Sequence, residues 1–114
     1  MKKIAVLLML LLAVAVRCAY AHSPSDMKIT FNPATKVLTV VIMHDVSRTV
    51  NHYTKRVDIH LNRKEIINDV FSRQDNDFSQ TVTYTIKDAK PGDTITVTAL
   101  CNIIGRIKRK ITVE

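Results

Sequence analysis

Short segments in which apolar and polar residues alternate are the feature that most restricts how this chain can fold. Alternation with a period of two places successive side chains on opposite faces of a β-strand. Turn-forming runs such as Asn32-Pro33, Asp75-Asn76-Asp77 and Lys90-Pro91-Gly92-Asp93 separate the segments at short intervals. The pattern predicts an all-β domain built from antiparallel strands.

Seven strands are predicted, and the segment from Val37 to Met43 is apolar on both faces, as expected of a central strand. Seven strands in about 90 residues predict an immunoglobulin-like antiparallel β-sandwich. The predicted strands are 28–31, 37–43, 53–61, 65–71, a strand with the inward row Phe78, Val82, Tyr84 and Ile86, then 95–101 and 106–113.

Two of these segments carry more detailed expectations. Segment 53–61 should alternate between its two faces. One face carries Tyr53, Lys55, Val57, Ile59 and Leu61, and the other carries Thr54, Arg56, Asp58 and His60. His60 is therefore expected to face water. In 95–101 the inner row is Ile95, Val97, Ala99 and Cys101. Segment 65–71 is open to a second interpretation, because its apolar residues also fit one face of a helix.

Residues 1–21 predict a secretory signal peptide. A basic start is followed by an apolar run, and Ala19-Tyr20-Ala21 matches a small-x-small cleavage site. Arg17 ends the apolar run before the roughly 20 residues that a membrane-spanning helix needs, so we expect contact with a membrane only during export. Cleavage of 21 of the 114 residues would leave one domain, 22–114, in the periplasm or outside the cell.

Charge and glycine content exclude several function classes. Cleavage would remove three basic residues and leave 14 basic against 10 acidic ones. The basic cluster of Arg106, Lys108, Arg109 and Lys110 has no aromatic residues interleaved on which bases could stack, so we expect a solvated strand face and no nucleic-acid partner. Only two glycines are present, so there is no phosphate-binding loop, and no serine lies in a nucleophile elbow.

Cysteine and histidine remain as the residues able to carry chemistry. Cys18 would leave with the signal peptide, and Cys101 alone has no internal disulfide partner. It is a buried apolar side chain, an intermolecular link or a functional thiolate.

Three histidines, His22, His44 and His52, fall outside the alternating faces at strand ends or before strands, where a rigid sandwich usually carries function. Cys101 also lies at a strand end. If these ends meet at one pole, three imidazoles and a thiolate converge, and such a set suits iron, copper or zinc. We therefore predict metal ligands at His22, His44, His52 and Cys101. The alternatives are a frayed terminal histidine, two surface histidines and a cysteine that only packs in the core.

The spacing of these residues resembles the iron-binding domain of desulfoferrodoxin and neelaredoxin. The matching motifs are His22-Ser23-Pro24, His44, His52-Tyr53 and Cys101-Asn102-Ile103-Ile104-Gly105, and together they span nearly all of 22–114. The resemblance implies an immunoglobulin-like sandwich that reduces superoxide at a mononuclear non-haem iron. It also implies three equatorial histidine ligands, an axial Cys101 and an electron-donor protein as partner.

The chain departs from the family pattern at several positions. Ile104 stands where the family has its fourth histidine, and Asp45 stands where it has a proline. The spacing from His44 to His52 is two residues longer, Thr54 and Arg56 replace an isoleucine and a tryptophan, and Tyr20-Ala21 replaces a Glu-Lys pair. Three functions therefore stay open: a superoxide-reducing iron protein, an exported metal-binding or electron-transfer protein, and a metal-free sandwich that binds another protein or the cell envelope.

The predicted cleavage site offers a substitute for the missing histidine. If His22 is the mature N-terminus, its α-amino group and its own imidazole can chelate one metal. Such an amine-imidazole pair resembles sites that favour copper, which makes copper the alternative to iron. With an amine pKa of about 7.7, metal affinity should rise with pH.

Overall fold

The computed structural model describes residues 22–114, and the predicted signal peptide at 1–21 lies outside the described residues. Within 22–114 the chain forms seven β-strands and no helix. The strands are β1 (Asp26–Asn32), β2 (Val37–Met43), β3 (Thr54–Leu61), β4 (Lys64–Val70), β5 (Ser79–Thr85), β6 (Thr94–Cys101) and β7 (Arg106–Thr112). None of residues 22–114 belongs to a helix long and apolar enough to span a membrane.

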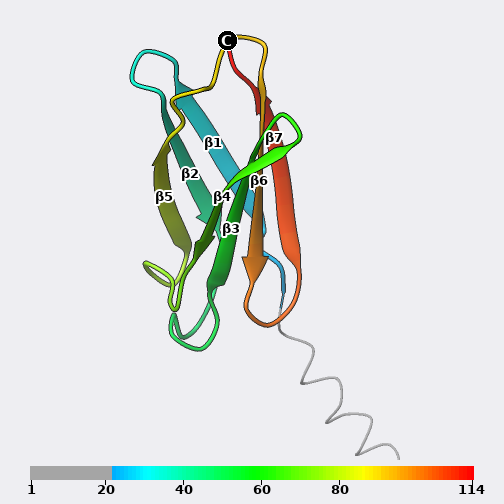
Figure 1. Ribbon diagram of the computed structural model, residues 1–114. Helices are drawn as coiled ribbons and strands as arrows, with labels where there is room; N and C mark the ends of the chain where they lie inside the picture. The colour runs from blue at the N-terminus through cyan, green and yellow to red at the C-terminus, as the bar shows by residue number, and fades with distance from the viewer. Residues whose placement is uncertain (1–21) are drawn as a thin grey trace, which may run out of the picture.

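Two antiparallel sheets make up the fold (Figure 1). One contains β1-β2-β5 and the other β4-β3-β6-β7, in that spatial order. The apolar strand β2 is the central strand of its sheet, as its sequence predicts. The all-β class and the immunoglobulin-like arrangement of seven strands are confirmed.

The core lies between the sheets and follows the alternation of the sequence. Every second residue of β2 is fully buried, and the predicted inner row of β6 is buried as well. Burial of such side chains is the main favourable contribution to folding. The buried apolar cluster consists of Met27, Leu38, Val40, Ile42, Val57, Ile59, Val82, Ile86, Ala89, Ile95, Val97, Ala99, Ile107 and Val113.

Segment 64–70 is a strand rather than a helix. It pairs with β3 through the two-residue turn Asn62-Arg63, and Asn62 adopts a φ of 56°, which asparagine tolerates well. β4 is an edge strand, and Tyr84 of β5 reaches across the gap between the sheets to donate a 2.8 Å hydrogen bond to Asp69 of β4. This bond ties the open edges of the two sheets together.

The face prediction for 53–61 is wrong at the start of the strand. The register of β3 against β6 shifts between Thr54 and Arg56, so Thr54 is fully buried and Lys55 is exposed. A β-bulge of this kind inserts one residue and reverses the alternation locally. The bulge places Thr54 directly opposite Cys101.

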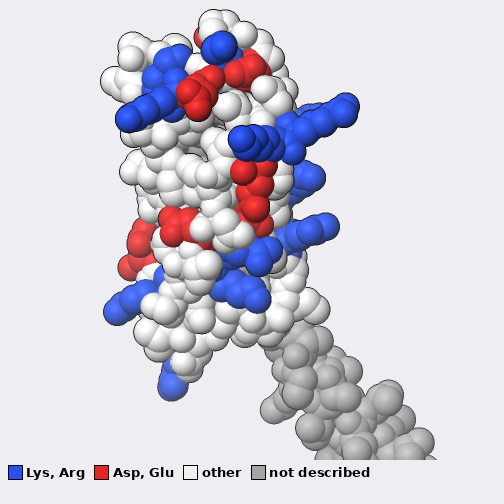
Figure 2. All heavy atoms as spheres, in the orientation of Figure 1, with Lys and Arg blue, Asp and Glu red and all other residues white. Residues whose placement is uncertain are grey.

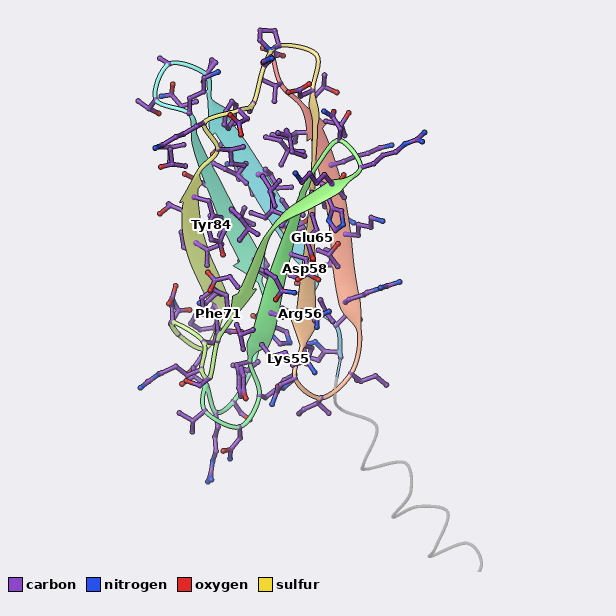
Figure 3. The ribbon with its side chains drawn as sticks, viewed as in Figure 1. Lys55, Arg56, Asp58, Glu65, Phe71 and Tyr84 are labelled. Atoms are coloured by element: carbon purple, nitrogen blue, oxygen red, sulfur yellow. The ribbon has the colours of Figure 1, made fainter. Side chains whose placement is uncertain are left out.

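Asp58 also differs from the expectation of a water-facing side chain. Its residue is only 8% exposed, because the neighbouring Arg56 lies over it with Nε 3.2 Å from both carboxylate oxygens (Figure 3). His60, two residues further on, is half-buried on the same outer face. A buried carboxylate needs a cationic partner, and Arg56 supplies it.

The predicted inward row of β5 fails at its first residue. Phe78 is 65% exposed, because it precedes the first paired residue of β5 and is not held against the opposite sheet. Gln80 occupies the inner position instead and is 4% exposed. The rest of the row, Val82, Tyr84 and Ile86, is buried or half-buried.

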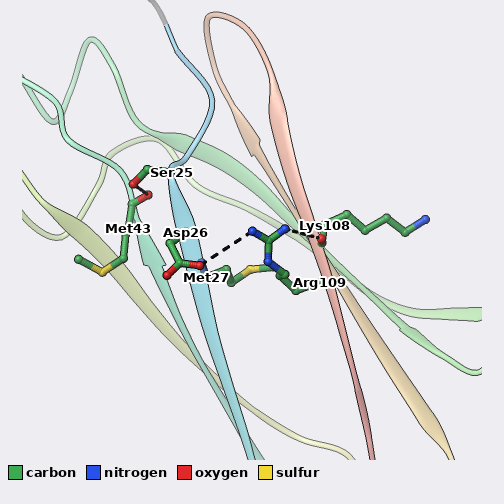
Figure 4. Close-up of polar contacts among 6 residues, drawn as sticks. All are labelled: Ser25, Asp26, Met27, Met43, Lys108 and Arg109. Carbon is green, nitrogen blue, oxygen red and sulfur yellow. Dashed lines mark hydrogen bonds and ion pairs between the residues drawn. The ribbon is translucent and has the colours of Figure 1, made fainter.

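The first residue of β1 and the segment before it contact both sheets (Figure 4). Ser25 donates its backbone N–H to the carbonyl oxygen of Met43 at 2.8 Å, which fixes the segment to the end of β2. Asp26 lies 4.0 Å from Arg109 of β7. These contacts hold residues 22–25 at the pole where β2 ends.

The basic residues of β7 are exposed, as expected of a solvated strand face. Lys and Arg side chains are interspersed with Asp and Glu over the visible face of the molecule in Figure 2.

Candidate metal centre

The four predicted ligands lie at one pole of the sandwich, at the bottom of Figure 1. β2 and β6 run toward this pole, while β1, β3 and β7 start from it. Antiparallel pairing therefore brings together the segment before β1, the β2–β3 loop (44–53) and the β6–β7 loop (102–105). His22 belongs to the first, His44 and His52 lie at the two ends of the second, and Cys101 precedes the third.

His44, His52 and Cys101 form a compact cluster. One potential ligand atom from each lies within 4.8 Å of the other two. Nε2 of His52 is 3.1 Å from the Cys101 sulfur, and the rings of His44 and His52 are perpendicular with centroids 4.6 Å apart. Two ligand atoms at 2.0 to 2.3 Å from one ion stand about 3 to 4.5 Å apart, so this cluster has the dimensions of a metal site.

His22 lies beside the cluster rather than within it. Its ring centroid is 5.6 Å from that of His44 and 5.4 Å from that of His52. The imidazole is exposed, and its Nδ1 is 2.9 Å from the carbonyl oxygen of Ser23. The backbone is closer, because the His22 carbonyl oxygen is 3.4 Å from Nε2 of His44. The ligand role of His22 stays a prediction.

The thiol of Cys101 is held by the turn that follows it. Cys101 is 4% exposed and donates its backbone N–H to the carbonyl oxygen of Gly105 at 3.0 Å. The N–H of Ile103 points at the sulfur from 3.4 Å. The sulfur thus accepts a backbone hydrogen bond at a fixed position, and cysteine sulfur binds metals as the thiolate.

Glycine is required at position 105 for two reasons. Its φ is 86°, in the region that residues with a Cβ rarely adopt. A Cβ at this position would lie 2.9 Å from Cβ and 3.1 Å from Cα of Ser23, and closer still to its hydroxyl. Gly105 therefore lets the β6–β7 loop pack against the residue that follows His22.

His52 is positioned by Asn102. The side-chain Oδ1 of Asn102 accepts from the N–H of Tyr53 at 2.9 Å, and its Nδ2 donates to the carbonyl oxygen of Asn51 at 2.9 Å. The backbone N–H of Asn102 donates to the Tyr53 carbonyl at 3.0 Å. Three hydrogen bonds thus hold the residues on either side of His52 against the end of β6.

His44 is fully buried and contacts two residues that sequence reasoning did not identify as part of the site. Oε1 of Gln74, in the β4–β5 loop (71–78), is 2.9 Å from its Nδ1, and the hydroxyl of Thr54 is 3.4 Å away. A single glutamine in a polar loop carries no signal in the sequence. Thr54 was missed because the bulge that turns it inward was not predicted.

The electrostatics of the cluster favour neutral imidazoles. Burial lowers the pKa of His44 below its usual value and outweighs the opposing hydrogen bond from Gln74; nearby His52 lowers it further. Burial also lowers the pKa of His52, with His22 contributing in the same direction. Neutral imidazole is the form that coordinates a metal. Two or three imidazoles and a thiolate form a set that suits transition metals rather than calcium or magnesium.

Ile104 supplies no ligand where the family pattern has a histidine. Its side chain is 59% exposed in the β6–β7 loop at the same pole. His60 lies on the outer face of β3 opposite Thr96 of β6, six residues along the strand from Thr54. His60 is thus on the outer face, as expected, but it is half-buried rather than fully exposed to water.

Fold and site together define an immunoglobulin-like β-sandwich with a His/Cys cluster at one pole that could hold a metal. His44 and Cys101 of this cluster are buried, and His52 is half-buried. No protein-family model matches the chain, and no curated protein matches it. Among solved structures it is similar to a variant of the superoxide reductase (neelaredoxin) from Ignicoccus hospitalis. The two share 17% sequence identity over 88% of this chain and 86% of the other, with a TM-score of 0.49.

Proposed function

We propose that this protein is exported and binds one transition-metal ion, iron in the first place, at the pole formed by His44, His52 and Cys101. The observation that supports the proposal is the convergence of these three side chains within 4.8 Å from separate segments of the chain. His22 is the proposed further ligand, since its imidazole is exposed and its ring centroid lies 5.4 Å from that of His52. The sequence motifs of the desulfoferrodoxin type support iron over other metals.

Metal analysis of the purified domain tests this proposal. We expect about one iron per chain after anaerobic loading, and a thiolate-to-iron charge-transfer band after oxidation. Cys101→Ser should abolish the band. His60→Gln is the matched control, because it removes a histidine from the outer face of β3 and should leave metal content and colour unchanged. A colourless protein without stoichiometric metal would favour the remaining candidate, a metal-free sandwich that binds another protein.

Reduction of superoxide is the activity that the family resemblance implies for such a centre. When bound, iron supplies one-electron chemistry between its ferrous and ferric states. Superoxide would gain one electron and two protons to give hydrogen peroxide, and a separate electron-donor protein would restore the electron. His44, His52 and Cys101 would hold the ion, and the buried position of Cys101 keeps its sulfur from solvent. Rapid mixing of the reduced protein with superoxide, compared with Cys101→Ser, measures this activity directly.

Copper is the second candidate, and the backbone of His22 favours it. The His22 carbonyl lies 3.4 Å from Nε2 of His44, so the main chain of His22 borders the cluster. If export leaves His22 as the first residue, we propose that its α-amino nitrogen and imidazole bind copper together with His44. Mass spectrometry of the exported protein tests the premise. A variant extended by one residue before His22 should lose the copper affinity and its increase with pH.

A further inference from the structure

Gln74 is a buried polar residue in a loop, and its burial demands an explanation. It lies in the β4–β5 loop, 30 residues from His44 in the chain, and its side chain is fully buried. Removing an amide from water without giving it hydrogen bonds is strongly unfavourable. All of its side-chain hydrogen bonds go to His44 or to Asn76 in its own loop.

The hydrogen bonds of Gln74 fix which end of its amide faces His44. Nε2 donates to the carbonyl oxygen of His44 at 2.7 Å and to that of Asn76 at 2.9 Å. Carbonyl oxygens only accept, so the amide nitrogen with its two hydrogens must lie on that side. Rotating the amide by half a turn would place Oε1 against two carbonyl oxygens. Oε1 therefore points at Nδ1 of His44, 2.9 Å away.

The amide oxygen in turn fixes the proton on His44. Because Oε1 has no hydrogen, the short contact with Nδ1 is attractive only if Nδ1 carries the proton. Two longer contacts could favour the other tautomer. The Thr54 hydroxyl, 3.4 Å from Nδ1, accepts from Nδ1–H but could donate to an unprotonated Nδ1. Nε2 of His44 is 3.4 Å from the His22 carbonyl oxygen and would donate to it in the other tautomer. Both contacts are longer than the one to Gln74. The Nε2–H tautomer would also place two acceptors, Oε1 of Gln74 and the unprotonated Nδ1, 2.9 Å apart. The bond to Gln74 decides the tautomer.

We infer that Gln74 is a positioning residue that holds His44 as the Nδ1–H tautomer, so that His44 offers the lone pair of Nε2 to a metal. The metal part of this inference rests on the proposed function, whereas the tautomer does not. A ligand imidazole whose second nitrogen donates to a fixed partner keeps its orientation and basicity. A neutral amide at this position polarises the imidazole less than a carboxylate does, which keeps His44 a neutral ligand.

Gln74 also ties the loop to the site, because its backbone N–H donates to the carbonyl oxygen of Thr49 at 3.0 Å. The β4–β5 loop is thereby joined to both the first residue and the middle of the β2–β3 loop. Displacement of Gln74 would free the ring of His44 to rotate as well as to change tautomer.

Nitrogen-15 NMR of the imidazoles in the metal-free protein, at about pH 8 where histidine is neutral, tests the inference. We expect the Nδ1–H tautomer for His44 in the wild type and in Gln74→Glu, which keeps an acceptor but loses both donated bonds. Gln74→Leu should shift His44 toward Nε2–H and lower metal affinity about 10–100-fold. Gln80→Leu is the matched control, because Gln80 is also buried, at 4% exposed, but its side chain accepts from the N–H of Asp75 and makes no bond to His44. It should leave the tautomer unchanged.

An Nε2–H tautomer in the wild type would overturn the inference. This measurement needs no variant, so it tests the inference even if Gln74→Leu does not fold. An unchanged tautomer in a folded Gln74→Leu would overturn it too. The correct tautomer in a protein that takes up no metal would refute the proposed function and leave the role of Gln74 intact.

Discussion

Substitution of the two glycines separates backbone strain from disturbance of the candidate metal centre. Both have a positive φ, 91° at Gly92 and 86° at Gly105. A Cβ added at Gly92 meets no atom within 4 Å, whereas one added at Gly105 collides with Ser23. Alanine at either position therefore pays the same conformational cost, and only Gly105→Ala must also move Ser23.

The size of each effect follows from these geometries. Alanine in the left-handed region destabilises the folded state by about 1–2 kcal/mol. Replacing glycine also makes the unfolded chain less flexible, which favours folding by about 0.4–1 kcal/mol. Gly92→Ala should thus lose about 1 kcal/mol, which corresponds to a fall in Tm of about 4–8 °C for a domain of this size. Gly105→Ala should lose more, because contacts of 2.9 and 3.1 Å with Ser23 force the segment before β1 away from the loop.

Metal binding should distinguish the two variants more sharply than stability does. Ser23 follows His22 directly, so its displacement moves the His22 backbone away from His44. We expect Gly105→Ala to bind ferrous iron about 10–100-fold more weakly than the wild type and Gly92→Ala to bind it equally well. Thermal unfolding in a chelator and anaerobic iron titration measure the two effects separately. Equal Tm values and equal affinities for the two variants would refute the reasoning.

Three further predictions address the rest of the fold and site. Folding lowers the pKa values of His44 and His52 from 6.5, so near and below that pH the unfolded chain binds more protons than the folded one. The free energy of unfolding of the metal-free protein should therefore fall between about pH 7 and pH 5. Urea titrations that show no fall would contradict this. Tyr84→Phe should cost about 1–2 kcal/mol in urea unfolding, since Asp69 loses its 2.8 Å donor, and an unchanged midpoint would exclude a role for this bond. Thr54→Val, which keeps the buried shape, should leave iron content unchanged but alter the NMR shift of His44 Nδ1; an unaltered shift would show that the 3.4 Å contact is not a hydrogen bond.

Most of the fold is predictable from the sequence because the core is built from simple alternation. The inner rows of β2 and β6, for example Val40 and Val97, are apolar at every second residue and are fully buried. The convergence of His44, His52 and Cys101 is predictable for a related reason. All three lie at strand ends, and antiparallel topology places those ends at the same pole.

The remaining features depend on interactions that one sequence does not reveal. The bulge at Thr54 depends on how β3 aligns with β6, which neither strand shows alone. Asp58 is buried because Arg56 covers it, and an alternating pattern cannot distinguish a covered carboxylate from a solvated one. Gln74 contacts His44 across a loop whose path is set by tertiary contacts with Thr49. Loops lack the periodicity from which strands are predicted.

The separation of the cluster residues along the chain has a consequence for biogenesis. His52 and Cys101 are 49 residues apart in sequence, and their contact requires β3 to be paired with β6. Pairings between distant segments form slowly, so a chain that has not yet folded lacks the assembled donor set. The compartment in which β3 and β6 pair therefore decides which metal ions the assembled cluster meets first.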